Sequence, residues 1–171
     1  MKLCEYRKSL TKPLRQSTLC LIVREGQILL AMKKRGFGQG RWNGVGGKLK
    51  RDESIKEAAI REAQEEIGIT PLSLKKVATL HFLFPEVPPE NDWNQEVMVY
   101  LVDRWEGQPI ESEEMAPKWF NIAEIPFESM WSDDIHWLPK VLGGTFIEAA
   151  FMFDRDQKLL EFEFLEGLGL S

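Results

Sequence analysis

The chain has 171 residues, the length of one domain that can bury a sizeable core without help from a metal or a disulfide. Hydrophobic residues make up 43% of the sequence and charged residues 29%, which excludes a largely disordered chain, a collagen-like repeat and a coiled-coil rod. The net charge of -5 argues against a protein that holds a nucleic-acid polymer by general attraction, and no apolar run approaches the roughly 20 residues that span a bilayer.

The N-terminal segment, residues 1–16, is basic and lacks the apolar stretch of a secretory signal. We interpret it as a basic extension of one domain that spans residues 17–171, and targeting to an organelle by this segment stays open. Cys4 and Cys20 form no closely spaced thiol pair, and Cys20 lies in an apolar run where a buried free thiol is expected. A cytoplasmic, reducing location fits this cysteine usage.

Two aliphatic segments, residues 18–23 and 27–33, open the domain and are separated by three residues that end in Gly26. This spacing predicts a hairpin of two strands. Residues 35–50 follow and contain six glycines, so the backbone there can take positive φ angles or approach a ligand closely. The glycine-rich loop is therefore the first candidate for a binding feature.

Residues 54–67 predict the first helix. Ser54 and Glu57 have the spacing of a capping box, and Gly68 is a typical residue to end a helix. Residues Ile55, Ala59, Ala63 and Ile67 recur at helical spacing and form an apolar stripe.

Later segments predict the remaining elements. Two longer strands, 73–84 and 96–105, flank residues 85–95, whose three prolines predict a long surface loop. A short strand at 118–120 comes next, and a second helix is predicted from Ser132 to Leu142. Phenylalanines alternate on both sides of a turn at 154–157, which predicts a final hairpin.

Three acidic residues of the first helix, Glu62, Glu65 and Glu66, share an arc of about 100° on the helix surface. Such a cluster is often only a solvated acidic face, and like charges at this spacing destabilise a helix. A bound divalent cation reverses that effect. Carboxylate oxygens and a glycine carbonyl such as that of Gly47 suit magnesium or manganese, and magnesium with glycine-rich backbone is typical of phosphate chemistry.

The arrangement of Gly47, Glu53 and residues 61–69 (Arg-Glu-Ala-Gln-Glu-Glu-Ile-Gly-Ile) resembles the signature of the Nudix hydrolases, with Ala63 as its one departure. The resemblance implies an α+β Nudix fold, a mixed β-sheet flanked by α-helices. It further implies that water attacks a nucleoside diphosphate derivative with Mg2+, or Mn2+, as cofactor. The catalytic and metal-binding residues that it implies are Gly47, Glu53, Arg61, Glu62, Glu65 and Glu66, with Arg61 orienting a neighbouring glutamate.

Flanking segments extend the resemblance to those Nudix hydrolases that act on oxidised purine nucleoside triphosphates such as 8-oxo-dGTP and 2-oxo-dATP. These segments are residues 29–38, 40–44, 111–115, 125–127 and 130–134. By matching position, Asn43, Asp133 and Asp134 are expected to hydrogen-bond the purine and Trp131 to stack on it. Further expected contacts are Thr18, Phe37, Phe82 and Met115 at the pocket, Lys33 at phosphate and Glu114 near the metal.

Two adjacent aspartates also have a chemical reason to read an oxidised purine. 8-oxoguanine carries a carbonyl at C8 and a proton at N7, and an aspartate pair that keeps one proton offers both a donor and an acceptor. Taken alone, Asp133 and Asp134 are about as typical of the acidic first turn of a helix, and Trp131, Trp137 and Phe82 would more often belong to a core than to a binding site.

The resemblance leaves other functions open, and one loop of this sequence departs from the purine-specific relatives. The chain is expected to be a monomer acting on a small nucleotide, with no nucleic-acid polymer or membrane as partner. One alternative is a Nudix hydrolase for another nucleoside diphosphate derivative, and another is a non-catalytic domain that senses a nucleotide. The loop at 85–95 is longer than the corresponding turn in the purine-specific relatives, and a loop at a pocket mouth is where specificity changes.

Overall fold

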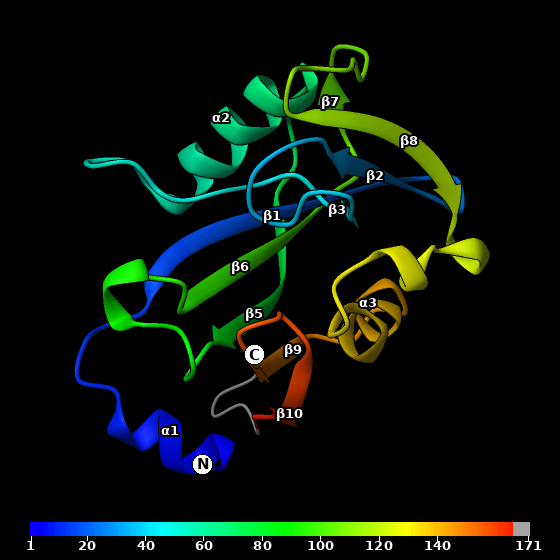
Figure 1. Ribbon diagram of the computed structural model, residues 1–171. Coiled ribbons are helices and arrows are strands. Elements are labelled where there is room, and N and C mark those ends of the chain that lie inside the picture. The colour runs from blue at the N-terminus through cyan, green and yellow to red at the C-terminus, as the bar shows by residue number, and fades with distance from the viewer. Residues whose placement is uncertain (166–171) are drawn as a thin grey trace.

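The computed structural model describes residues 1–165 of the chain. Three α-helices and ten strands follow one another there, with short 3-10 helices in the connections (Figure 1). They are α1 (Leu3–Ser9), β1 (Arg15–Arg24), β2 (Gln27–Lys33), β3 (Trp42–Asn43), α2 (Ile55–Ile67), β4 (Thr70–Pro71), β5 (Lys75–Leu83), η1 (Pro89–Asn91), β6 (Gln95–Val102), β7 (Trp105–Glu106), β8 (Met115–Asn121), η2 (Ile122–Glu124), η3 (Phe127–Ser129), α3 (Asp134–Leu142), β9 (Ile147–Phe153) and β10 (Leu159–Phe164).

One large mixed sheet forms the centre of the described chain. Its strands lie in the order β10-β9-β5-β6-β1-β2-β3, and β8 pairs with β2. The pairs β1–β6 and β5–β9 are parallel, and the other pairs in this sheet are antiparallel. The mixed sheet of the expected Nudix fold is therefore confirmed.

Helix α2 covers one face of the sheet. The Ser54 hydroxyl accepts a hydrogen bond from the Glu57 backbone N–H at 3.1 Å, and Gly68 ends the helix with a φ of 72°. The side chains of Ala59, Ala63 and Ile67 are fully buried against Cys20 and other residues of the central strands. Capping and the apolar stripe thus fix the helix where the sequence predicts it, with its acidic arc at the edge of the packed face.

Helix α3 packs on the opposite face, so the sheet lies between helices (Figure 1). Trp137, Leu138 and Val141 of α3 are buried against the side chains of β5, β6 and β9 that point away from α2. The segments that lead into α3 run along the rim of this face. The α3 side of the sheet is where the cavity described below opens.

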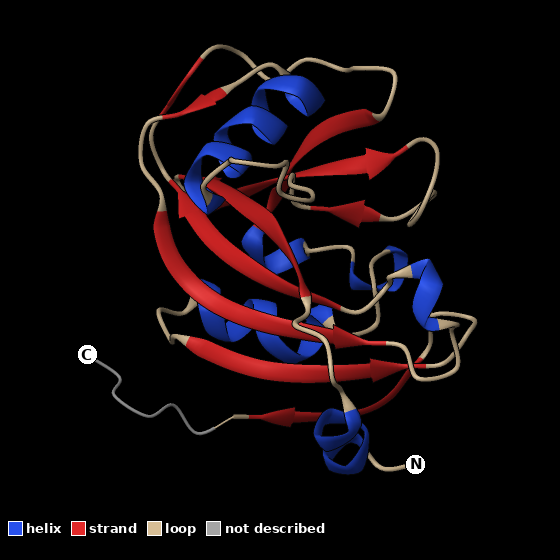
Figure 2. Cartoon of the chain, turned by 90° about the vertical axis from the view of Figure 1, so that its left-hand side faces the viewer, coloured by secondary structure: helices blue, strands red, loops and turns tan. Residues whose placement is uncertain are grey.

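The N-terminal segment forms helix α1, which no sequence pattern had predicted. Leu3 is buried in a small cluster with Leu83, Ala150 and Met152, on the same face of the sheet as α2. Arg7 forms an ion pair with Glu163 of β10 at 2.7 Å, and Figure 2 shows α1 beside this end of the sheet. Strand β1 begins at Arg15, within the segment assigned to the extension.

Most predicted elements are present, but one strand ends earlier than predicted. The strand predicted over 96–105 ends at Val102, and Trp105–Glu106 forms β7, which pairs with β4 in a separate two-stranded sheet. Ser73 causes the break because its hydroxyl donates to the Asp103 carboxylate at 2.7 Å and accepts from the Arg104 N–H at 3.2 Å. None of the helices within residues 1–165 has the length and hydropathy that a membrane span requires.

Candidate active site

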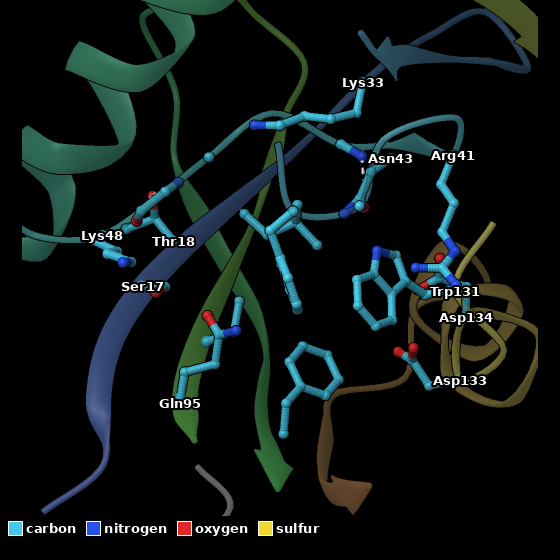
Figure 3. Close-up of a pocket in the computed structure, with 18 of the residues that line it drawn as sticks. Ser17, Thr18, Lys33, Arg41, Asn43, Lys48, Gln95, Trp131, Asp133 and Asp134 are labelled. Carbon is cyan, nitrogen blue, oxygen red and sulfur yellow. Dashed lines mark hydrogen bonds between the residues drawn. The ribbon is translucent and has the colours of Figure 1, made fainter. Parts of the chain in front are cut away.

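A cavity of about 280 Å³ opens on the α3 face of the sheet (Figure 3). Strands β1, β5, β6 and β9 supply its floor, and the glycine-rich loop and the segment before α3 supply its walls. All nine residues predicted to contact the nucleotide line this cavity, although they come from distant parts of the sequence. They are Thr18, Lys33, Phe37, Asn43, Phe82, Met115, Trp131, Asp133 and Asp134.

The aspartate pair is buried at one end of the cavity. The Trp137 indole N–H donates to the Asp133 carboxylate at 2.8 Å, and among the described residues the Asp134 Oδ2 atom has no hydrogen-bond partner. Burial raises the pKa of Asp133 to about 6. Burial and the adjacent Asp133 charge raise the pKa of Asp134 well above its ordinary value. The pair therefore keeps a proton near neutral pH and offers one donor beside carboxylate acceptors.

An aromatic wall stands beside the aspartate pair. The Trp131 ring lies 5.1 Å from the Phe37 ring and 5.7 Å from the Phe153 ring, measured between centroids. The Arg41 guanidinium lies over Trp131 at 4.2 Å and donates a 2.6 Å hydrogen bond to the Gln157 side chain in the β9–β10 turn. Trp131 is thus held in place by aromatic and cation contacts, as a stacking platform requires.

The glycine-rich loop brings Asn43 and Gly47 close to the cavity. A Cβ atom at Gly46 would lie 1.9 Å from the Thr18 carbonyl oxygen, so the loop can lie against β1 only with glycine at this position. The Gly47 carbonyl accepts a 2.9 Å hydrogen bond from the Thr18 N–H. The Asn43 side-chain oxygen accepts from the Gly44 N–H at 2.8 Å.

The carboxylates of α2 surround one arginine. Arg61 donates to Glu53 at 2.6 and 2.9 Å, to Glu62 at 2.9 Å and to Glu65 at 3.2 Å. Hydrogen bonds from Arg61 and from the Lys50 N–H lower the pKa of Glu53 to about 2. Arg61 therefore offsets the repulsion among the glutamates and holds three of them in fixed positions.

Glu66 differs from the other glutamates of this cluster because its carboxyl group is buried and lines the cavity. The residue is 5% exposed, and within the described chain its Oε2 atom has no hydrogen-bond partner. Burial, followed by the neighbouring Glu62 charge, raises the pKa of Glu66 to about 8, against the opposing charge of Lys33. A buried carboxyl with a free oxygen beside an acidic neighbour is an arrangement that a cation stabilises.

The structure does not bring every predicted ligand together. In residues 1–165 no group of three acidic, histidine or cysteine side chains already converges as a metal site, because Arg61 engages Glu53, Glu62 and Glu65. Glu114 is exposed, lies 3.6 Å from Arg35 in an ion pair and does not line the cavity. The metal and catalytic roles of all these residues stay predictions.

Several cavity residues were not identified from the sequence. Arg15, Ser17 and Gln95 lie on the floor. Arg41 lies over Trp131, Phe153 packs against the Trp131 ring, and Trp137 bonds Asp133. Alternation along β1 places Ser17 on the same side as the buried Leu19, and this pattern could have identified it. The partners of Arg41 depend on contacts between distant segments, which the sequence pattern does not contain.

Known proteins resemble this chain over most of its length. The model of the NUDIX domain family matches residues 13–141. A zebrafish (Danio rerio) protein named oxidized purine nucleoside triphosphate hydrolase is 44% identical over 144 residues, which cover 84% of this chain and 90% of that protein. The mouse (Mus musculus) protein of the same name is 40% identical over 149 residues, which cover 87% and 93%.

Solved structures agree with this result. The crystal structure of the MutT protein from Bacillus halodurans superposes with a TM-score of 0.77 at 27% sequence identity. The match covers 88% of this chain and 97% of the bacterial one. Fold and sequence therefore lead to the same group of proteins.

Proposed function

This chain belongs to the NUDIX domain family, and we propose that it hydrolyses oxidised purine nucleoside triphosphates to the monophosphate and pyrophosphate, with magnesium as cofactor. The observation that carries the proposal is the shared cavity, which contains both the buried pair Asp133–Asp134 and the buried Glu66. The aspartate pair suits an oxidised base, and the buried Glu66 suits phosphate chemistry. The zebrafish and mouse relatives, whose names specify this activity, support the same substrate class.

The oxidised base would bind at the end of the cavity that contains Asp133 and Asp134. An 8-oxopurine presents the N7 proton as a donor and the C8 carbonyl as an acceptor, whereas the unmodified purine has an acceptor at N7. One carboxylate can accept from N7–H while the protonated carboxyl of its neighbour donates to an acceptor of the same base. Stacking on Trp131 would fix the plane of the ring, and the Asn43 amide would add a further hydrogen bond.

The residues at the other end fit a divalent cation. The unpartnered Oε2 atom of Glu66 and the raised pKa of this group show a carboxylate that lacks compensation, and carboxylate oxygens are hard ligands. Glu62, Glu65, Glu66 and the Gly47 carbonyl would hold the ion, with Glu114 as a further carboxylate. Magnesium, or manganese in its place, would neutralise charge on the phosphate oxygens and make water a better nucleophile.

The chain's own groups would hold the phosphates and the water in place. The Lys33 ammonium lines the cavity close enough to Glu66 to influence its pKa, so it can contact a phosphate bound there. Arg61 would orient Glu53, Glu62 and Glu65 through the hydrogen bonds that it already makes. One of these glutamates would accept the proton of the attacking water.

We further propose a free nucleotide as the substrate, with the monomeric state and the cytoplasmic location predicted from the sequence. A gel-filtration measurement of the molecular mass tests the first of these two predictions, and fractionation of cells tests the second. Neither bears on the reaction itself.

A hydrolysis panel tests the proposed function. Purified protein with magnesium chloride is incubated with 8-oxo-dGTP, 2-oxo-dATP, dGTP, dATP and a dinucleotide polyphosphate, and kcat/KM is measured for each. We expect a preference of about tenfold or more for the oxidised purines, with monophosphate and pyrophosphate as products. Faster turnover of the dinucleotide polyphosphate would instead identify another Nudix activity. Tight nucleotide binding without turnover would identify a sensor.

A further inference from the structure

A polar corner interrupts the apolar floor of the cavity. Strands β1 and β6 pair in parallel with Arg15 opposite Gln95 and Ser17 opposite Val97. Because side chains alternate along a strand, Arg15, Ser17 and Leu19 share the cavity side of β1, and Gln95 and Val97 share it on β6. The polar corner consists of Arg15, Ser17 and Gln95, and beyond it the floor is formed by aliphatic and aromatic side chains.

Two groups of the polar corner are buried without a hydrogen-bond partner. Ser17 is 4% exposed, and in the described part of the chain neither its hydroxyl oxygen nor the Arg15 Nε atom has a partner. Buried polar groups in folded proteins are almost always hydrogen-bonded, so two such exceptions in one corner require an explanation. Both residues line the cavity, and a bound ligand can supply the missing partners.

The position of the polar corner restricts which part of a nucleotide can reach it. Figure 3 shows Ser17 and Gln95 on the side of the cavity opposite Trp131 and Asp133. Ser17 precedes Thr18, whose N–H bonds the Gly47 carbonyl, so the polar corner adjoins the expected phosphate end. In a nucleotide the sugar joins the base to the first phosphate. Its 2′- and 3′-hydroxyl groups are carried by the ring between the base and that phosphate, so a nucleotide that spans the cavity would bring them over the floor between the two ends.

The chemistry of the polar corner favours a hydroxyl over a phosphate. The Arg15 charge is partly compensated by Asp92, whose carboxylate lies 3.5 Å from Nη1. The Arg15 Nε–H donates, and the Ser17 hydroxyl and the Gln95 amide can each donate and accept. A phosphate oxygen only accepts, whereas a sugar hydroxyl both accepts and donates, so the hydroxyl matches this set of groups more completely.

We infer that Arg15, Ser17 and Gln95 form a subsite for the sugar hydroxyls of the nucleotide, and that this subsite makes the enzyme favour ribonucleotides over deoxyribonucleotides. The inference rests on the proposed function, because it assigns one more part of the same substrate. It adds a specificity determinant on the sheet floor, separate from the base-reading aspartates and from the carboxylates of α2.

The test compares three triphosphates that share 8-oxoguanine and differ in the sugar: ribose, 2′-deoxyribose and 2′,3′-dideoxyribose. We expect kcat/KM of the parent protein to fall at least about tenfold from the ribose to the dideoxyribose compound. In Ser17→Ala and Gln95→Leu the three values should converge, with the larger loss on the ribose compound. The matched control is Gln16→Ala, because Gln16 is exposed on β1 and faces away from the cavity.

Thermal unfolding with and without ligand distinguishes a role of Ser17 in ligand binding from a purely structural role. Since the Ser17 hydroxyl makes no hydrogen bond within the described chain, Ser17→Ala should unfold no earlier than the parent without ligand. It should lose more of the stabilisation by 8-oxoguanosine monophosphate than of that by the deoxy compound. Equal parent rates on all three sugars, or equal losses on all three in the variants, would overturn the subsite and leave the proposed function intact. Absence of turnover on every oxidised purine would overturn both.

Discussion

The side-chain amide of Asn94 donates a 2.8 Å hydrogen bond to the hydroxyl of Tyr6, which ties helix α1 to the loop beside the cavity. The Asn94 side-chain oxygen in turn accepts from the Phe84 N–H at 2.7 Å. In the same loop, the Trp93 ring packs against the rings of Phe37 and Phe84, with centroid distances of 4.9 Å and 5.4 Å. The N-terminal segment and the long loop thus jointly support an aromatic wall of the cavity.

Trp93→Ala should weaken nucleotide binding without impairing the chemical step. Phe37 is 44% exposed, and removal of the Trp93 ring leaves it free to rotate away from the substrate. We expect KM for an oxidised purine triphosphate to rise about three- to tenfold at nearly unchanged kcat. Trp93→Phe should restore most of the affinity. Steady-state kinetics of the three proteins measure the effect, and an unchanged KM in Trp93→Ala would show that the loop does not shape the pocket.

Tyr6→Phe should have the same effect at smaller amplitude. The substitution keeps the packing of α1 and removes the hydroxyl that bonds Asn94. We expect KM to rise about two- to threefold, since a single partly buried hydrogen bond contributes about 1 kcal/mol or less at this distance from the substrate. Lys8→Ala is the control, because Lys8 lies on the same helix and its side chain makes no hydrogen bond to the loop within residues 1–165. A KM equal to that of the parent would contradict the proposed support of the wall by α1.

Asp134→Asn should stabilise the protein above neutral pH while damaging base recognition. In the folded state the pKa of Asp134 lies well above its ordinary value of 3.8, so the unfolded chain releases this proton at a lower pH than the folded one. Folding is therefore penalised as the pH rises through the interval between the two pKa values. Asparagine carries no such proton, so the unfolding midpoint of the variant should exceed that of the parent at pH 8.

The difference between these two midpoints should shrink towards pH 3, below the ordinary aspartate pKa of 3.8, where aspartate is mostly protonated in both states. Thermal scans at the two pH values measure it, with the exposed Asp156→Asn as the control. The same variant should raise KM for oxidised purines about tenfold or more. A variant less stable than the parent at pH 8 would contradict the protonated pair.

Glu66→Gln should lower kcat about 100-fold or more without unfolding the protein. The substitution removes one charge and one oxygen ligand from the expected cation site, and the amide fits the same buried position. Stabilisation by added magnesium in a thermal scan should decrease in parallel. Glu86→Gln, on the surface loop, provides the charge-matched comparison. Normal turnover by Glu66→Gln would remove this residue from the reaction.

Arg61→Ala should lower the unfolding midpoint, and excess magnesium should partly restore it. Without the guanidinium, Glu53, Glu62 and Glu65 lose their shared partner and repel one another. A divalent cation can replace part of the lost positive charge. Arg61→Lys keeps the positive charge but loses the several directed hydrogen bonds of the guanidinium. We therefore expect its unfolding midpoint to fall less than its activity. Equal midpoints of Arg61→Ala and the parent in the absence of magnesium would refute this account.

Local patterns predicted much of the fold because they act over a few residues. The capping residues Ser54 and Gly68 fixed both ends of α2, and the aliphatic runs on either side of Gly26 predicted the β1–β2 hairpin. The short helix α1 was missed, since its seven residues are stabilised by contacts with β5, β9 and β10 that have no local signature. The strand after β6 was misjudged for a similar reason, because Ser73 redirects the chain from 30 residues away.

The sequence by itself determined the Nudix signature, the placement of three glutamates on one arc of α2 and the candidate nucleotide contacts, because residue identity and helical spacing fix these features. The tertiary structure alone decided which of these groups lose contact with water. Burial separates Glu66 from its neighbours and gives Asp133 and Asp134 their raised pKa values. It also creates the polar corner, because Ser17 and Gln95 come together only when β1 and β6 pair. Desolvation and pairing depend on the whole folded chain, and no local pattern encodes them.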